Sequence, residues 1–387
     1  MRKLNGIKCH KLFTPFQEID DALVRIDDGR ILDIIHDGTA INEGILDATK
    51  LIVAPGYVDI HLHGVKGYDA TSGGSVAIKG MSESLVKYGV TSFFPSAVTT
   101  SKQTLLDFLE NTREMWEEKP HGSRVAGAHL EGPFISPKKP GAMLTEFFRK
   151  PDSTEFLKYI EKCGNMPLRM TLAPELPNAI DIIKLANENG VTLSLGHTNA
   201  TYEESDKAID LGVSLINHFY TMMRSFHHRD PGLIASGLTR KNVIVELLTD
   251  LVHVHPAVMD LTFRIKGPEG IAIITDATPA AGMPDGEYIV GGQVKVYVKD
   301  GKCLQANGNL AQGALTMDQT VRNVGSILKI EPKSLLMMSS FTPAKAVHMD
   351  KLIGSIEPGK YADFVILDQD YNVVYTVVGG ILFYNAS

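Results

Sequence analysis

Cysteine is scarce in this sequence, and the basic residues are scattered. Three cysteines, Cys9, Cys163 and Cys303, stand far apart among 387 residues, so neither a disulfide framework nor a CxxC metal knuckle is indicated. The net charge is −7, and no run of lysine and arginine could follow a phosphate backbone. We therefore expect a protein of the reducing cytoplasm that has no nucleic-acid partner.

Long apolar runs and nucleotide-binding motifs are also missing. No stretch of about 18 uninterrupted apolar residues occurs, and the basic N-terminus is followed by no apolar run of signal-peptide length. We expect no membrane partner. The sequence contains neither the GxxxxGK[ST] of a phosphate-binding loop nor the GxSxG of a serine nucleophile, which argues against nucleotide binding and serine catalysis.

Both ends of the chain are rich in β-strand patterns. Residues 22–47 form short alternating segments separated by Asp-Gly and Glu-Gly, which is typical of hairpins. Residues 356–385 contain three more such segments, separated by Pro-Gly, Asp-Gln-Asp and Gly-Gly. Because neither end is large enough to be stable alone, we predict one small β-sandwich-like domain made of residues 1–53 and 354–387.

The centre of the chain alternates short apolar runs with amphipathic stretches, the pattern of repeated βα units. This predicts an α/β fold, a (β/α)8 TIM-like barrel over residues 54–353. An inserted hairpin is expected at about 284–308, followed by closing helices. The eight predicted strands are residues 57–63, 91–98, 124–131, 168–175, 191–197, 214–220, 242–250 and 270–277.

Histidines and carboxylates stand at the ends of these predicted strands, where a barrel of this kind builds its active site. His61 and His63 lie two residues apart, so their side chains face the same way along the first strand. Imidazole and carboxylate groups at one rim are the ligands that Zn²⁺ prefers, with Fe²⁺ and Mn²⁺ as alternatives. The other strand-end residues are Glu131, His197, His218, Asp250 with His253, and Asp276.

Each of these residues also has an ordinary structural interpretation. A single strand-end histidine is more often hydrogen-bonded in the core than a ligand, and a single aspartate is often a helix cap. Six candidates at corresponding strand ends are harder to explain by packing. His129 suits either a site role or a core hydrogen bond, whereas the loop position of His227 and His228 beside Arg229 favours substrate contact or a turn.

Several motifs resemble those of the amidohydrolase superfamily and, within it, the family of N-acetylglucosamine-6-phosphate deacetylases. The resemblance covers nearly the whole chain and implies a barrel with a small β-domain from both termini, and a homodimer. It rests on the segments APGYVDIHLHG, HLEGPFISPKKPGA, LAPE, SLGHTNA, NHFYTMMRSFHHRDPG, HVHP, TDATPAAG and GSIEPGKYADFVILD.

The resemblance also implies an activity and residue roles. The expected reaction is metal-dependent hydrolysis of the N-acetyl group of N-acetylglucosamine 6-phosphate, a small amino sugar phosphate, giving acetate and glucosamine 6-phosphate in amino-sugar catabolism. One or two divalent ions are expected, most simply zinc. By position, the first ion has the ligands Glu131, His197 and His218, and the second has His61 and His63.

The remaining implied roles concern catalysis and substrate binding. Asp276 corresponds to the catalytic acid and base. Arg229 resembles an arginine that contacts the sugar phosphate across a dimer interface, and His253 resembles a neighbouring substrate-contacting histidine. Thr221, Met222 and Met143 also fall in the expected substrate pocket.

This chain departs from the family pattern around the substrate. Met143 stands where the family has an amide-contacting histidine, and a thioether cannot donate that hydrogen bond. Thr221 replaces an asparagine, Leu251 follows Asp250 in place of glycine, and Gln312-Gly313 replaces Gly-Ser. A second ion at His61 and His63 could replace the lost polarisation. Two alternatives therefore stay open: hydrolysis of a different N-acyl sugar phosphate or amide, and a non-catalytic relative that senses sugar phosphates.

Overall fold

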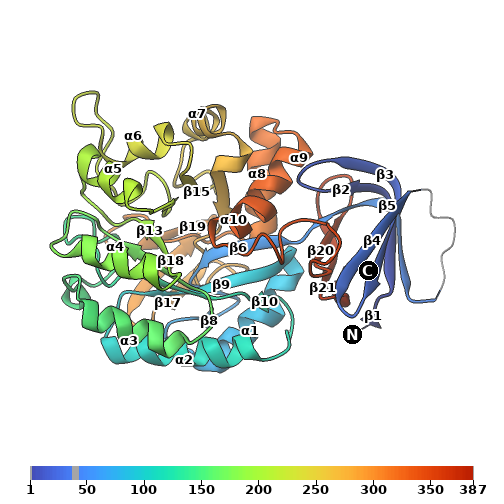
Figure 1. The fold of residues 1–387 in the computed structure, drawn as a ribbon, viewed down its shortest axis with the longest axis horizontal. Coiled ribbons are helices and arrows are strands. Elements are labelled where there is room, and N and C mark those ends of the chain that lie inside the picture. Colours follow the sequence, from blue (N-terminus) through green and yellow to red (C-terminus); the bar gives the residue numbers. More distant parts are fainter. Residues whose placement is uncertain (1, 37–42, 387) are drawn as a thin grey trace.

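The computed structural model describes residues 2–36 and 43–386, and they form a barrel with a separate β-sheet domain beside it (Figure 1). Met1, residues 37–42 and Ser387, which belong to the predicted terminal domain, lie outside the described residues. The barrel occupies the centre of the chain and the sheet domain combines both ends. The predicted fold class is confirmed.

Eight parallel strands make the barrel wall in the described part of the chain. One strand lies in each predicted apolar run. The wall closes where β6 meets β16: Leu62 forms a parallel bridge with Ala277, and the Asp276 N–H donates to the His61 carbonyl at 2.9 Å. The strands are β6 (Tyr57–Leu62), β9 (Val90–Val98), β11 (Ala128–Glu131), β12 (Leu168–Leu172), β13 (Thr192–Leu195), β14 (Leu215–Ile216), β15 (Ile244–Leu248) and β16 (Ile271–Ile274).

Helices follow most of the strands and surround the wall (Figure 1). The start of α5 shows how the sequence sets such a boundary: the Thr201 hydroxyl accepts from the Glu204 N–H while the Glu204 carboxylate accepts from the Thr201 N–H. The helices are α1 (Gly74–Leu85), α2 (Lys102–Glu117), α3 (Ser153–Cys163), α4 (Ala179–Glu188), α5 (Tyr202–Asp210), α6 (Gly232–Thr239), α7 (Pro256–Lys266), α8 (Met317–Leu328), α9 (Pro332–Leu336) and α10 (Thr342–Ala346).

Short elements complete the barrel. A π-helical turn, Met337–Phe341, joins α9 to α10. The remaining pieces are β7 (Gly64–Val65), β8 (Tyr68–Asp69), β10 (Arg124–Val125) and the 3₁₀ turns Val86–Tyr88, Thr145–Phe147 and Pro268–Gly270.

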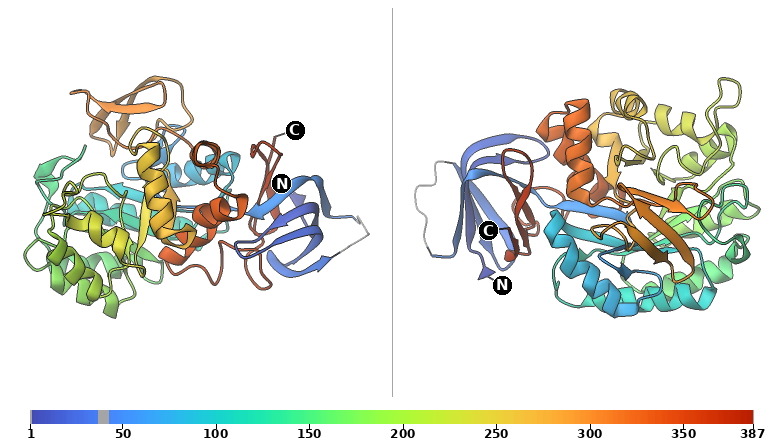
Figure 2. Two further views of the ribbon diagram at one scale, coloured as in Figure 1. Left: turned by 90° about the horizontal axis from the view of Figure 1, so that it is seen from above. Right: turned by 180° about the vertical axis from the view of Figure 1, so that it is seen from behind.

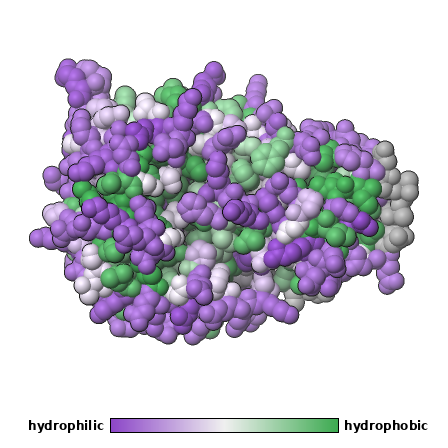
Figure 3. All heavy atoms as spheres, in the orientation of Figure 1, coloured by the Kyte–Doolittle hydropathy of each residue, from purple (hydrophilic) through white to green (hydrophobic). Residues whose placement is uncertain are grey.

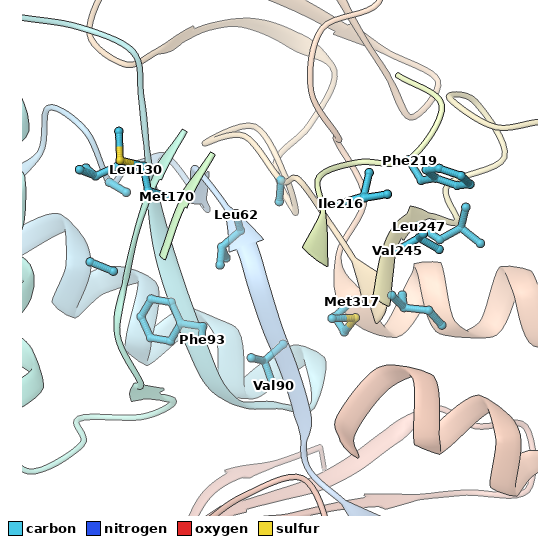
Figure 4. Close-up of a cluster of buried hydrophobic side chains, with 14 of the residues drawn as sticks. Leu62, Val90, Phe93, Leu130, Met170, Ile216, Phe219, Val245, Leu247 and Met317 are labelled. Atoms are coloured by element: carbon cyan, nitrogen blue, oxygen red, sulfur yellow. The ribbon is translucent and has the colours of Figure 1, made fainter. Parts of the chain in front are cut away.

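Apolar side chains fill the layer between the strands and the helices (Figure 4). Phe93 of β9 is fully buried, and Val245 and Leu247 of β15 belong to the same cluster as Met317 of α8. Burying one such side chain contributes about 1.5–3 kcal/mol. This apolar layer fixes the strands, so the residues that follow each strand meet at one end of the barrel.

The two ends of the chain form one curled sheet, where a sandwich-like arrangement was predicted. The reason is β5 (Ile45–Pro55), which pairs with β2 in parallel and with β20 in antiparallel orientation, and so joins the two halves. A single apolar core includes Ile7, Val24, Phe364 and Val377. The order is β1 (Arg2–Lys3), β22 (Ile381–Asn385), β21 (Val373–Val378), β20 (Phe364–Leu367), β5, β2 (Gly6–Phe13), β3 (Glu18–Asp27) and β4 (Arg30–His36).

The segment expected to be a hairpin at about 284–308 has a third strand. β17 (Gly286–Val290), β18 (Val294–Lys299) and β19 (Lys302–Gln305) pair in antiparallel order. Figure 2 shows this small sheet standing out from the barrel. Val290, Val296 and Cys303 pack with Val98 of β9 and Ala280, so the insertion is fixed to the end of the barrel.

One face of the molecule is mostly polar (Figure 3). Hydrophilic side chains cover much of the face seen in Figure 3, and apolar residues gather in smaller patches, one of them over the terminal sheet. Within residues 2–36 and 43–386, no helix has the length and apolarity needed to cross a membrane.

Candidate active site at the C-terminal end of the barrel

Residues at or just beyond the C-terminal ends of five barrel strands meet in two buried groups. One contains Glu131, His197 and His218, and the other His61, His63 and Asp276. Within each group, the potential ligand atoms all lie within 4.8 Å of one another. These are the six strand-end residues to which the sequence assigned metal binding and acid-base chemistry.

In the first group, Glu131 lies between two imidazoles. Its Oε1 is 3.2 Å from His197 Nε2 and 3.0 Å from His218 Nε2, and the two nitrogens are 3.0 Å apart. The Nδ1 of His197 is 2.8 Å from the Lys139 carbonyl, which can only accept a hydrogen bond. The His197 Nδ1 therefore carries the proton, and the lone pair of Nε2 points at the carboxylate and at His218.

The second group repeats this arrangement. His63 Nδ1 donates to the Ser96 carbonyl at 3.0 Å, and His63 Nε2 lies 3.2 Å from both His61 Nε2 and Asp276 Oδ1. Lone pairs and carboxylate oxygens so close together repel one another unless a cation lies between them. The donor set therefore fits a divalent metal at either group.

Buried charge makes this region favourable for cations. Burial alone would lower the pKa of His61, but Asp276 and Glu131 beside it raise that pKa to about 10. Burial would raise the pKa of Glu131, yet His61 and His197 hold it well below its usual range. The negative potential that favours imidazolium also favours a metal ion.

A further layer of charged residues orients these ligands, and the sequence analysis missed it. His61 Nδ1 lies 3.1 Å from Glu246 Oε2. Arg169 pairs with Glu246 and donates to Asn217 Oδ1 at 2.6 Å, and Asn217 donates to Glu131 Oε1 at 2.9 Å. The available signal was a charged residue inside an apolar run, because Arg169 lies in β12 and Glu246 in β15, both fully buried.

The backbone turns sharply at three of the site residues. His197, His218 and Asp276 have φ values of 45°, 20° and 47°, a region that residues other than glycine adopt at a cost of about 1–3 kcal/mol. Each residue stands two positions after the last residue of its strand. The surrounding barrel thus holds these side chains in a conformation that an isolated strand would not adopt.

A cavity of about 280 Å³ opens above the first group and Asp276. Four of the predicted substrate residues line it: Met143, Thr221, Met222 and His253. The Thr221 hydroxyl donates to the His218 carbonyl at 2.7 Å and so stabilises the loop. Gln312 lines the same cavity.

Other candidate residues lie elsewhere or have structural partners. Arg229 is exposed and does not line this cavity, and its Nη1 lies 3.1 Å from His228 Nε2. His129 hydrogen-bonds Ser96 and Thr171 in the core, the structural alternative allowed for it. Asp250 accepts from the Val252 and His253 N–H groups and turns the chain after β15. Neither His227 nor His228 belongs to a metal-binding group among the described residues.

The fold and the site together define a class: a barrel enzyme that collects imidazole and carboxylate ligands at the C-terminal ends of its strands. Residues 52–382 match the model of the Amidohydrolase family. The chain belongs to this family and is a hydrolase that acts on an amide.

Similar proteins match over nearly the whole chain. The N-acetylglucosamine-6-phosphate deacetylase of Vibrio furnissii is 34% identical over 370 residues, which is 95% of this chain and 92% of that protein. The N-acetylgalactosamine-6-phosphate deacetylase of Escherichia coli O157:H7 is 33% identical, with 95% and 96% covered. A mutant of the Mycobacterium smegmatis N-acetyl-D-glucosamine-6-phosphate deacetylase, solved with N-acetyl-D-glucosamine-6-phosphate, superposes with a TM-score of 0.92 at 26% identity and covers all of both chains.

Proposed function

We propose that this chain hydrolyses the N-acetyl group of N-acetylglucosamine 6-phosphate, giving acetate and glucosamine 6-phosphate in amino-sugar catabolism. The observation that carries the proposal is the buried group of Glu131, His197 and His218, with Asp276 beside it, at the base of a cavity of about 280 Å³. The names of the relatives that match over nearly the whole chain support this substrate.

The first metal site consists of Glu131, His197 and His218, and the second of His61, His63 and Asp276. Zinc suits this mixture of imidazole and carboxylate, and iron or manganese is the alternative. Glu131 faces both groups, because its Oε1 points to His197 and His218 and its Oε2 lies 3.2 Å from His63 Nε2. A divalent ion bound here supplies Lewis acidity, which polarises the amide carbonyl and makes a water molecule more acidic.

Asp276 moves the proton in this proposal. Although burial would raise the pKa of Asp276, the neighbouring His61 and His63 lower it, so the carboxylate is ionised and able to accept a proton from the attacking water. It then donates that proton to the departing amine, acting first as base and later as acid. The same cavity holds the sugar, and its buried base excludes bulk water from the amide.

N-acetylgalactosamine 6-phosphate is a second candidate substrate. It is suggested by the Escherichia coli relative, which is 33% identical to this chain and named for that sugar. The two sugars differ only in the orientation of one hydroxyl group. Met143, Thr221 and Met222 in the cavity wall are where such a preference would arise.

Arg229 fits a site completed by a second subunit. It is exposed and lies outside the cavity of its own chain. In a homodimer, it would bind the sugar phosphate in the cavity of the other subunit, whereas His253 would line the cavity of its own subunit. We place this enzyme in the cytoplasm, where sugar phosphates are formed and the three buried cysteines stay reduced.

The test uses purified protein of known metal content and both sugar phosphates. Acetate release is measured for the parent chain and for Asp276→Asn. Release from the parent and loss in the variant support the proposal. A metal-loaded protein that releases no acetate acts on a different amide, whereas one with neither metal nor release is a non-catalytic relative. Activity that survives in Asp276→Asn would rule out the proton transfer described above.

A further inference from the structure

The side chain of Gln312 is buried in the wall of the substrate cavity without a partner. Gln312 is only 9% exposed and lines the cavity together with Asp276 and Met143. Its Oε1 is buried and has no hydrogen-bond partner in the described chain. Buried amides are nearly always hydrogen-bonded, because an unpaired polar group loses its hydration without compensation. An unpaired amide at a substrate cavity therefore indicates a partner that arrives with the ligand.

The backbone that follows Gln312 is fixed. The Gly313 N–H donates to the Asp276 carbonyl at 2.8 Å, and the Thr278 N–H donates to the Gly313 carbonyl at 2.9 Å. A Cβ atom at Gly313 would lie 2.1 Å from the Thr275 carbonyl oxygen, so only glycine allows this close approach. Gln312 is thus held directly beside the segment that carries Asp276.

His253 fixes the other side of the same loop. Its Nε2 donates to the Ala311 carbonyl at 2.7 Å, and its Nδ1 lies 2.6 Å from Asp250 Oδ2. Both ring nitrogens are therefore engaged within the chain. His253 lines the cavity, but its polar atoms serve to hold the loop that presents Gln312.

The other neutral donors of the cavity wall are also engaged. The Tyr220 hydroxyl is 2.5 Å from Thr262 Oγ1, and the Thr221 hydroxyl donates to the His218 carbonyl. Met143, which borders a small adjoining cavity together with Gln312, has no donor to offer. The hydroxyl groups of Tyr220 and Thr221 thus have partners within the chain. Among the described residues that line the cavity outside the metal-binding groups, Gln312 keeps a neutral polar group without one.

We propose that Gln312 hydrogen-bonds the N-acyl amide of the substrate and that His253 is a positioning residue acting through Ala311. This inference rests on the proposed function, since it takes the ligand to be an N-acylated amino sugar phosphate. The N-acyl amide is trans, so its oxygen and its N–H point in opposite directions and one side chain meets only one of them. The unpaired Gln312 Oε1 accepts from the substrate N–H. Gln312 thereby supplies a polar contact to the substrate amide in a cavity wall where Met143 has no donor to offer.

Kinetics of Gln312→Leu test the contact directly. The substitution keeps the size of the side chain but removes both polar atoms, and we expect kcat/KM for acetate release to fall roughly 10²-fold. Gln312→Glu, which keeps an acceptor oxygen at this position, should lose less than Gln312→Leu. The matched control is Gln293→Leu, a glutamine that borders only the adjoining cavity and should stay within twofold of the parent. Metal content and melting temperature show whether each variant is folded. A folded, metal-loaded Gln312→Leu within twofold of the parent overturns the proposal.

Coupling to His253 tests the positioning role. If His253 acts through Ala311, His253→Ala lowers kcat/KM in the parent but adds little in the Gln312→Leu background. Losses that simply multiply in the double variant would mean that His253 acts independently, and would overturn that part of the proposal.

A binding measurement separates this inference from the proposed reaction. In metal-loaded Asp276→Asn, the Kd for N-acetylglucosamine 6-phosphate is measured by calorimetry with and without Gln312→Leu, and we expect at least a tenfold weakening. If the parent releases no acetate but Gln312→Leu still weakens binding, the proposed reaction is refuted and the Gln312 contact is supported. An unchanged Kd, or no binding in either protein, overturns the contact.

Discussion

The end of the barrel and the terminal sheet place the same chemical groups in opposite surroundings. On the sheet, His10 Nδ1 lies 2.9 Å from Asp21 Oδ1, and the two side chains are 60% and 65% exposed. In the barrel, His63 Nε2 lies 3.2 Å from Glu131 Oε2, and the side chains are 0% and 1% exposed. The distances are alike, but water screens the first pair and not the second. Burial, rather than proximity, therefore marks the functional group.

Removing the central carboxylate of the barrel is expected to have the largest effect. Glu131→Gln keeps the shape but takes a negative charge away from both metal-binding groups, so metal affinity should fall by more than about 10²-fold and acetate release should be lost. Metal analysis after dialysis and an acetate assay measure this. Asp21→Asn, on the sheet, should change neither quantity. Full metal content in Glu131→Gln would show that Glu131 is not a ligand.

Asp276→Asn separates proton transfer from metal binding. We expect turnover to fall about 10²- to 10⁴-fold, the usual contribution of a general acid or base, while the ion at Glu131, His197 and His218 is retained. The assay is acetate release at matched metal content. Loss of that ion along with the activity would mean that the two groups cannot be occupied independently.

The buried ion pair of Arg169 and Glu246 should matter for stability. Arg169→Met removes a fully buried cation and leaves Glu246 without its arginine partner, which is expected to cost about 3–5 kcal/mol in the free energy of unfolding. Urea denaturation monitored by circular dichroism measures this loss. Arg169→Lys, which keeps the charge, should recover part of it. A variant as stable as the parent would show that Glu246 is compensated by other groups.

A pH dependence is expected from His253. Burial alone would lower its pKa, but the bond to Asp250 raises it to about 9. Because the folded state binds the proton more tightly than the unfolded state, whose histidine pKa is about 6.5, this stabilisation is complete below about pH 6.5 and is lost as the pH rises through 9. Melting temperatures between pH 6 and 10 should fall less steeply for His253→Gln. If the melting temperatures of the parent and of His253→Gln change in parallel with pH, His253 is not protonated in the way described here.

The smallest effect belongs to the exposed sheet. Arg25 pairs with Asp33 on neighbouring strands, and their side chains are 47% and 38% exposed. Such pairs contribute little, because water screens both charges. Arg25→Met should leave the urea midpoint unchanged within error, in contrast to Arg169→Met. If Arg25→Met lost as much stability as Arg169→Met, burial would not explain the difference between the sheet and the barrel.

Much of the fold could be predicted because its signals are local. Buried parallel strands appear as apolar runs, so all eight barrel strands were found, and the spacing of His61 and His63 placed both on one face. The third strand of the insertion was missed. One domain from both ends was predicted, but not that its strands form one continuous sheet. The continuity depends on β5 pairing with β2 on one side and β20 on the other, and residues of β5 and β20 are more than 300 positions apart.

For the candidate site, only the residues at strand ends could be predicted. The structure brings Glu131, His197 and His218 together, while their role as ligands remains a prediction. The supporting residues Arg169, Asn217 and Glu246 were not found, since Arg169 and Asn217 are 48 positions apart and His61 and Glu246 are 185 apart. Nothing in a single sequence pairs residues over such distances.

The sequence by itself indicated which residues are candidates for the site and which end of the barrel they occupy, because strand periodicity and strand termini are properties of neighbouring residues. Only the tertiary structure decided which of them share a site, which are shielded from water, and that Gln312 is left without a partner beside Asp276. Those outcomes depend on burial and on contacts between distant segments, and both exist only once the barrel has closed.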